Sequence, residues 1–213
     1  MSTATALPNS VKDLAALAMA WQSPSTQWQE ALRRAQGNYF PSPLVGEGRG
    51  EGSLSARVAL KELLNVPVGD LAGEHNRLFG SSGTCPLDLA HFWTDNPFQQ
   101  AARLADLAGF YKAFGVEVEE GVRPDALPAV LELVSWLVFK RQYALDQGWS
   151  ERADISSRAL QTLLTGFVHP AFEGFERRLE EASAWPMYCL LYQVTKTYLH
   201  AIQTEVGNHA ANV

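Results

Sequence analysis

The side chains that most often perform chemistry are present in this sequence, but their spacing does not form a catalytic arrangement. The five histidines are scattered, and none lies four residues from another or in a His-Glu-x-x-His pattern. The chain has neither a Gly-x-Ser-x-Gly turn nor a Cys-His signature around Cys85. The other cysteine, Cys189, is too distant for a Cys-x-x-Cys pair, which argues against a zinc site. We therefore predict a binding protein without catalytic residues, metal or cofactor.

Two loops hold the residues best suited to contact a partner. The first follows a helix that ends at Leu78 to Gly80, and it contains the sequences Cys-Pro-Leu-Asp and His-Phe-Trp. The second reads Arg-Pro-Asp-Ala-Leu-Pro, and its aspartate, Asp125, is expected to cap the next helix while accepting hydrogen bonds from a cationic ligand. Each loop taken alone can also be read as structural, with its apolar side chains in the core. The candidate peptide-binding residues are Leu78, Phe79, Gly80, Pro86, Asp88, Phe92, Trp93, Tyr111, Pro124, Asp125, Leu127 and Glu132.

The elements that must position these residues are helices. Apolar residues recur at intervals of three and four along most of the chain, and no stretch alternates long enough to predict a strand. Asn96-Pro97 is typical of a helix start, Gly115 of a helix end, and Trp185-Pro186 of the start of the last helix. We predict an all-α fold, a single-domain helical bundle of about nine helices. The expected helices span residues 11–22, 25–36, 54–65, 67–79, 97–114, 125–147, 151–166, 170–183 and 186–205.

The length of 213 residues suits one domain, which we place at residues 1–206, with a frayed tail at 207–213. A Gly-rich insertion at residues 41–53 has glycine at every second position from 46 to 52, and we expect it to form a flexible loop. The insertion lacks the Gly-Lys-Ser/Thr ending of a phosphate-binding loop, so it does not predict nucleotide binding.

Composition limits the classes of partner. The chain is 46% hydrophobic and 19% charged, and its formal net charge of −6 argues against a nucleic-acid-binding protein. A cluster of three glutamates, Glu117, Glu119 and Glu120, is interpreted as a solvated loop. The apolar run Leu14 to Trp21 is far shorter than the ~20 residues that span a bilayer, and no secretory signal is visible. These features predict a soluble cytoplasmic protein with no membrane span.

Several short motifs follow one another along the chain: Leu78-Phe79-Gly80 with Cys85-Pro86, Tyr111 with Gly115, Pro124 to Leu127 with Leu131-Glu132, and the aromatic C-terminal helix that ends at Glu205. Their order resembles the TorD/DmsD/NarJ-like family of cytoplasmic chaperones for DMSO-reductase-type molybdoenzymes. The resemblance extends over residues 54–205 and departs from the family pattern at Ala126, where the family has a histidine. It also departs at Leu87 to Leu89 and in the Gly-rich insertion.

The resemblance implies a chaperone that binds the twin-arginine leader and the body of an apo-molybdoenzyme catalytic subunit. The chaperone would hold this subunit until its cofactor is inserted and export can follow, as a monomer or a domain-swapped dimer. A leader combines a cationic pair with an apolar segment, so its receptor needs carboxylates beside an apolar groove. Asp88 and Asp125 would set which peptides fit, and the aromatic residues would dominate affinity.

Other functions remain open at this point. A helical adaptor or small-ligand-binding protein without a chaperone role would be favoured if the two loops lay far apart. A small helical enzyme that uses Glu132 or Asp125 as a base would need a deep pocket with at least two titratable groups. Guanine-nucleotide binding would need a phosphate cradle, which the sequence does not offer. The chaperone interpretation therefore depends on the two loops forming one cleft.

Overall fold

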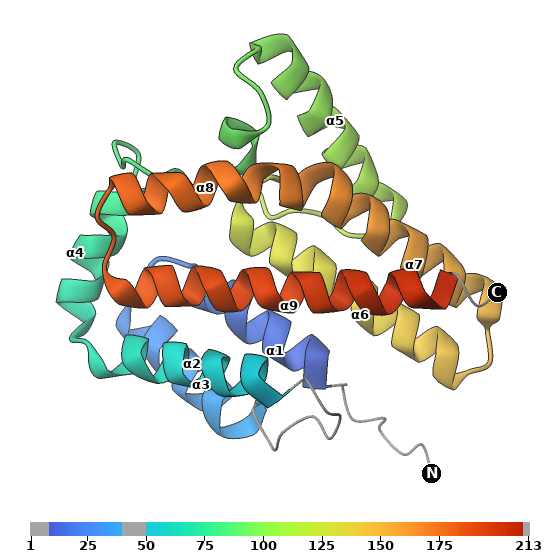
Figure 1. Cartoon of the computed structure of the whole chain (residues 1–213), viewed down its shortest axis with the longest axis horizontal. Coiled ribbons are helices and arrows are strands. Elements are labelled where there is room, and N and C mark those ends of the chain that lie inside the picture. Colours follow the sequence, from blue (N-terminus) through green and yellow to red (C-terminus); the bar gives the residue numbers. More distant parts are fainter. Residues whose placement is uncertain (1–8, 40–49, 211–213) are drawn as a thin grey trace.

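The computed structural model describes residues 9–39 and 50–210, and every regular element within these ranges is helical (Figure 1). The predicted all-α fold is confirmed. The α-helices are α1 (Asn9–Ala20), α2 (Thr26–Tyr39), α3 (Gly50–Asn65), α4 (Val68–Phe79), α5 (Pro97–Ala113), α6 (Leu127–Asp146), α7 (Ser150–Leu163), α8 (His169–Glu181) and α9 (Pro186–Ala210). A short 3-10 helix, η1 (Leu89–Phe92), lies between α4 and α5.

Helices α7 and α8 were predicted as separate helices, but they are joined by a π-helical turn, η2 (Leu164–Val168), without a break. The nine predicted helices therefore form eight continuous ones in the described ranges. Pro170 explains the turn, because proline has no N–H to donate to the carbonyl of Gly166. That carbonyl instead accepts a hydrogen bond from the guanidinium of Arg103 on α5. The next carbonyl, of Phe167, accepts from the Trp93 indole at 2.7 Å.

The core lies where α1 packs against α6, and where α9 packs against α3 and α7. Trp21, just after α1, is fully buried, and its indole N–H donates to the hydroxyl of Thr195 on α9 at 3.1 Å. Arg141 on α6 is also buried, and its guanidinium lies 3.0 Å from the carboxylate of Glu205, which ties the end of α9 to α6. These contacts hold α9 against the residue that follows α1 and against α6.

Local signals set the helix ends that the sequence predicted. The Asn96 side chain accepts from the N–H of Phe98 at 3.0 Å, with Pro97 in the first turn of α5. After α5, Gly115 adopts a φ of +69°, a left-handed conformation that glycine adopts without strain. Two boundaries differ from the predicted segments. Helix α3 begins at Gly50, inside the stretch predicted as a loop, and α9 continues to Ala210; residues 41–49 and 211–213 lie outside the described residues.

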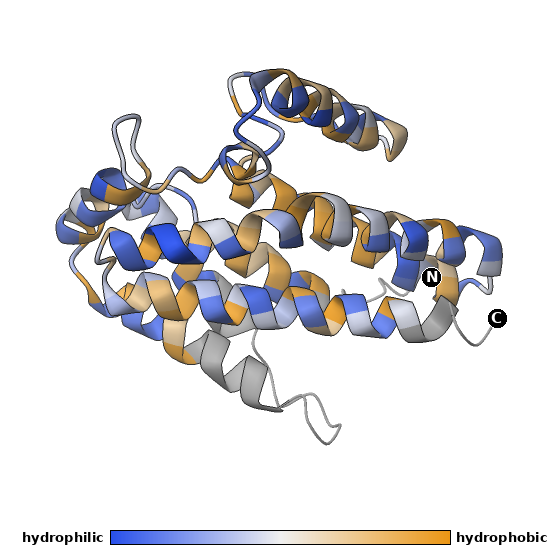
Figure 2. Ribbon diagram, turned by 45° about the horizontal axis from the view of Figure 1, so that its top comes forward, coloured by the Kyte–Doolittle hydropathy of each residue, from blue (hydrophilic) through white to orange (hydrophobic). Residues whose placement is uncertain are grey.

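Helix α5 stands apart from the layers formed by the other helices, as both ribbon views show (Figures 1 and 2). It packs against η1, and its buried residues, Leu107 and Tyr111, face the rest of the chain. The Tyr111 hydroxyl donates to the carbonyl of Pro124 at 3.0 Å. Helix α5 is therefore anchored at its C-terminal half to the loop that precedes α6.

Candidate functional site

The two loops singled out in the sequence lie side by side. Asp88 in the first loop and Ala126 in the second form an isolated antiparallel β-bridge. The N–H of Leu89 donates to the carbonyl of Asp125 at 2.9 Å, and the N–H of Leu127 donates to the carbonyl of Leu87 at 2.9 Å. This short backbone pairing fixes the loop after α4 against the start of α6.

A cleft of about 1460 Å³ opens beside this pairing. Its walls come from the turn after α1, from α4 and the loop after it, from the end of α5 with the loop that follows, from the first turns of α6, and from α8. Eight of the twelve candidate residues line it: Phe79, Gly80, Pro86, Asp88, Phe92, Trp93, Tyr111 and Glu132. The structure therefore brings most of the candidate residues to one surface, and their binding of a peptide stays a prediction.

The other four candidates do not line the cleft. Leu78, Asp125 and Leu127 are fully buried, and Pro124 is half-buried. Leu78 and Leu127 are core residues beneath the paired loops. The carbonyl of Leu78 also accepts from the N–H of Cys85 at 2.8 Å, which folds the first loop back onto α4.

The predicted capping role of Asp125 is wrong. Helix α6 has Ala126 at its N-cap position, and no side chain caps it there. The Asp125 carboxylate instead accepts from the N–H of Ala90 at 3.0 Å and from the guanidinium of Arg123 at 3.0 Å. The same Arg123 lies 3.1 Å from the carboxylate of Asp88, so one cation links both loops. Asp125 is thus a positioning residue for the loop pairing.

Carboxylates outnumber cations on the cleft walls. Glu132 has a pKa raised by burial and, less strongly, by Glu119. Among the described residues Glu132 forms no ion pair, and it accepts only a long hydrogen bond from Gln22 at 3.4 Å. Asp88 also has a pKa raised by burial, an effect that Arg123 opposes. The carboxylates that line the cleft are Asp88, Asp95, Glu117, Glu119 and Glu132, and the lining arginines are Arg177 and Arg178.

Aromatic rings form an apolar part of the cleft. The ring of Phe79 lies 5.9 Å from that of Trp21 and 5.0 Å from that of His75, and the ring of Phe92 lies 5.6 Å from that of Phe175. The imidazole of His75 is buried, its Nε2 lies 3.3 Å from the carbonyl of Trp21, and burial lowers its pKa. A neutral His75 therefore belongs to this apolar surface near neutral pH.

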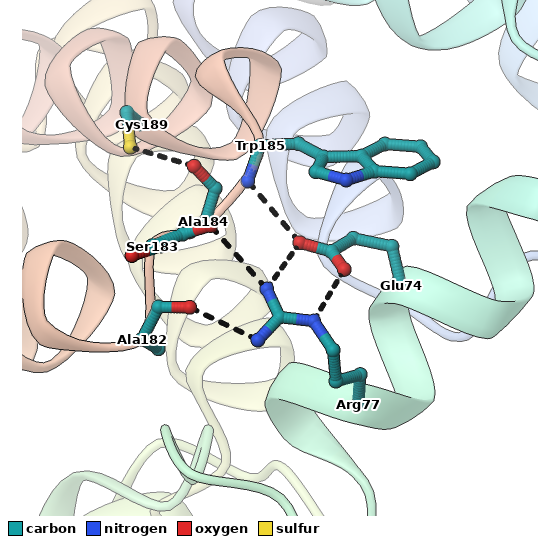
Figure 3. Close-up of polar contacts among 7 residues, drawn as sticks. All are labelled: Glu74, Arg77, Ala182, Ser183, Ala184, Trp185 and Cys189. Atoms are coloured by element: carbon teal, nitrogen blue, oxygen red, sulfur yellow. Dashed lines mark hydrogen bonds and ion pairs between the residues drawn. The ribbon is translucent and has the colours of Figure 1, made fainter.

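Behind this surface, an ion pair on α4 holds the connection between α8 and α9 (Figure 3). The Glu74 carboxylate receives two hydrogen bonds from Arg77, at 2.6 and 2.7 Å, and one from the N–H of Trp185 at 3.2 Å. The Arg77 guanidinium also donates to the carbonyls of Ala182 at 2.9 Å and Ser183 at 3.4 Å. The hydrogen bonds from Arg77 are the main reason that the pKa of Glu74 is lowered. These hydrogen bonds from α4 fix the end of α8 beside the cleft.

A family model described as the nitrate reductase delta subunit matches residues 51–175, more than half of the chain. The chain belongs to this family. A search of the curated proteins found no match. The nitrate reductase delta subunit family consists of maturation chaperones for molybdoenzymes, in agreement with the resemblance seen in the sequence. The matched residues include both loops of the cleft.

Many of the residues that line the cleft of this delta subunit family member were missed by the sequence analysis, among them Trp21, Gln22 and His75. Trp21 and Gln22 precede the family match and reach the cleft only because the end of α1 packs beside α4. His75 gave no signal in the sequence because no other histidine lies at a helical spacing from it. Within the described residues, no group of three His, Cys, Asp or Glu side chains is arranged to hold a metal ion. No helix in the same ranges has the length and apolar character needed to cross a membrane.

Proposed function

We propose that the chain is a cytoplasmic chaperone whose cleft binds the twin-arginine leader of a molybdoenzyme catalytic subunit. Binding would hold the apo-subunit for cofactor insertion and delay its export. The observation that carries this proposal is the cleft itself, in which both loops, five carboxylates and several aromatic rings share one surface. In this proposal the chain acts by binding and not by catalysis.

The chemistry of a leader matches the two kinds of surface in the cleft. Its guanidinium groups would contact Glu132, and its apolar segment would lie on Phe79 and Phe92. Glu132 is the best candidate for direct contact because it forms no ion pair among the described residues, whereas Asp88 and Asp125 share Arg123. A charge-assisted hydrogen bond contributes about 1.5–3 kcal/mol when shielded and close to nothing when exposed. The apolar contacts are therefore expected to provide most of the affinity.

The same cleft also meets the condition set for the small-enzyme alternative, because several titratable groups line it and the pKa of Glu132 is raised. A raised carboxylate pKa is equally expected for a partly desolvated residue in a cleft that binds a cationic partner. Membership of a family of maturation chaperones favours binding.

Calorimetry with the purified chain and synthetic leader peptides tests the proposal. A peptide that contains the Arg-Arg pair should bind, and its Gln-Gln counterpart should bind several-fold more weakly. Phe79→Ala should reduce affinity more than Glu132→Gln, since apolar contacts dominate. Glu62→Gln, an exposed change on α3 away from the cleft, is the matched control. Equal binding of both peptides, or a Phe79→Ala variant that binds like the parent, would contradict the proposal.

A further inference from the structure

A second concave surface, which we call the aromatic groove, lies where the end of α5 meets α6 and α7. It has a volume of about 490 Å³ and is separate from the cleft, with which it shares no lining residue. Its apolar side chains are Phe114, Trp136, Phe139, Tyr143, Trp149 and Ile155.

This groove concentrates exposed apolar surface. Seven large hydrophobic side chains are exposed among the described residues, and four of them line the groove. Trp136 is 39% exposed, Trp149 41%, Tyr143 43% and Ile155 44%. Single exposed hydrophobic residues are normal, but a contiguous group of them marks an interaction site. The clustering therefore indicates a surface that is covered by a partner.

The pattern of α6 supports this conclusion. Its fully buried residues, such as Val130, Val134 and Leu137, face the core. Trp136, Phe139 and Tyr143 recur at intervals of three and four on another face, so α6 is apolar on two sides. A helix with two apolar sides is normally covered by other elements on both sides. None of the described residues covers the second side of α6, where Trp136 and Tyr143 are exposed.

The aromatic side chains form an ordered wall. The rings of Trp136 and Phe139 lie 5.5 Å apart with an angle of 28° between their planes, and those of Phe139 and Tyr143 lie 6.1 Å apart at 30°. The ring of Trp149 then meets Tyr143 edge-on at 5.8 Å. Aromatic rings fixed by their neighbours lose little conformational entropy when a ligand covers them.

The charge of the groove identifies its occupant. Within the part of the chain that the structure describes, its only charged lining residues are cations, Lys140 and Arg152. The Lys140 ammonium lies 5.4 Å from the centre of the Trp136 ring, and the Arg152 guanidinium lies 4.4 Å from that of Trp149. A guanidinium stacked on a ring keeps its N–H edge free to bind a carboxylate. In a chain with a net charge of −6, a groove without carboxylates is complementary to acidic ligands.

We propose that the aromatic groove is a second peptide-binding site, which binds a segment of another polypeptide that combines acidic residues with aromatic or aliphatic ones. A concave site lined by three elements suits an inserted peptide better than a flat membrane surface, which would call for a larger basic cluster. The inference goes beyond leader binding, because the groove has the opposite charge to the cleft.

Peptide display tests this proposal. A library of random peptides of about twelve residues, selected on the purified full chain, should yield sequences rich in Asp or Glu and in large apolar residues. Affinities of the recovered peptides are then measured by fluorescence anisotropy. Binding should weaken by about tenfold or more in the Lys140→Glu/Arg152→Glu variant and in Trp136→Ala. The Glu132→Gln variant, changed in the cleft, should bind the recovered peptides with the same affinity as the parent. Circular dichroism checks that each variant is folded.

Several outcomes would overturn the proposal. These are recovery of no peptide, recovery of neutral or basic peptides, or binding that survives the double substitution. Self-association that the double substitution abolishes in light scattering would assign the groove to a second copy. Sedimentation with phosphatidylglycerol vesicles that depends on Lys140 and Arg152 would assign it to a membrane surface. Leader peptide affinity is measured in parallel, and loss of leader binding with intact groove binding would reject only the function proposed for the cleft.

Discussion

The cleft and the aromatic groove both use α6, but they are built in different ways. The start of α6 contributes Glu132 to the cleft, and the remaining walls come from α1, α4, α8 and two loops that are distant in sequence. The middle of α6 contributes the largest share of the groove, with Trp136, Phe139, Lys140, Tyr143 and Ala144, and the remaining residues come from the end of α5, the start of α7 and the residues that flank them. The cleft depends on long-range packing, whereas the groove is largely a property of one helix face.

The two surfaces also differ in charge. Five carboxylates and two arginines line the cleft, while the groove has two cations and no carboxylate. Opposite charge on two separate surfaces lets one protein discriminate between ligands of opposite charge, since a like charge opposes the wrong ligand at each site. Substitutions that affect one surface and spare the other test this division.

The largest expected difference is between two tryptophans, one in each region. Trp21→Ala removes a fully buried side chain and its hydrogen bond to Thr195, and it should lower the free energy of unfolding by about 3–5 kcal/mol. Trp136→Ala removes a side chain that is 39% exposed, and it should cost at most about 1 kcal/mol. Urea denaturation of both variants measures the difference. Similar losses would show that the groove, too, is part of the stabilising core.

The second expected effect tests the loop pairing. Asp125→Ala leaves the N–H of Ala90 and the guanidinium of Arg123 without their buried acceptor, so it should lower the free energy of unfolding by about 1–3 kcal/mol. Leader affinity should fall because the cleft walls shift, while binding at the groove should not change. Asp70→Ala, an exposed change in the first turn of α4, is the matched control. An Asp125 variant with parental stability would refute the positioning role.

A smaller effect is expected from the titration of Glu132. Because burial raises its pKa, leader affinity should fall at a higher pH than for an ordinary glutamate as the solution is acidified. The contribution of Glu132 to the free energy of unfolding changes with pH in the opposite direction to its contribution to leader affinity. The folded state binds this proton more tightly than the unfolded state, so the contribution is present at low pH and is lost as pH rises through the raised pKa. Calorimetry as a function of pH should show this loss of leader affinity on acidification. The Glu132→Gln variant should lack the pH dependence. An unchanged pH profile in Glu132→Gln would exclude Glu132 as the titrating group.

The features that were predictable from the sequence depend on neighbouring residues. The start of α5 at Asn96-Pro97 and its end at Gly115 follow from local backbone chemistry, and so they were predicted correctly. The continuous helix from α7 to α8 was not predicted, because the carbonyl groups freed at the π-turn accept hydrogen bonds from Arg103 and Trp93. Both donors are more than sixty residues away along the chain.

In the candidate site, too, some features follow from the local sequence and others depend on distant residues. The chaperone interpretation required the two loops to meet, and their backbone pairing agrees with that requirement. The sequence could not show that Trp21 lines the cleft or that Asp125 is fully buried, because both facts depend on how distant helices pack. The spacing of Trp136, Phe139 and Tyr143 could have indicated a second apolar face of α6, but that inference was not drawn from the sequence. The aromatic residues of the groove are exposed because no helix among the described residues covers them. No local sequence pattern encodes that absence.

The smallest expected effect comes from Gly174, where α8 approaches η1. A Cβ atom at this position would lie 2.9 Å from the Phe92 ring, so the ring has to move in Gly174→Ala. Alanine stabilises a helix by about 1 kcal/mol relative to glycine, and crowding costs about 1–3 kcal/mol, so the net change in unfolding free energy should be small. Leader affinity should nevertheless fall by about two- to threefold, because Phe92 lines the cleft.

The Gly73→Ala variant on α4 separates the gain in helix stability from the crowding of the Phe92 ring. No heavy atom lies within 4 Å of the position of its added Cβ, so this variant gains helix stability without crowding. It should therefore unfold at a higher urea concentration than the parent and bind the leader peptide equally well. If Gly174→Ala also binds like the parent, displacement of Phe92 does not affect the ligand. The apolar part of the bound segment would then lie nearer to Phe79 and Trp21, at the α4 side of the cleft.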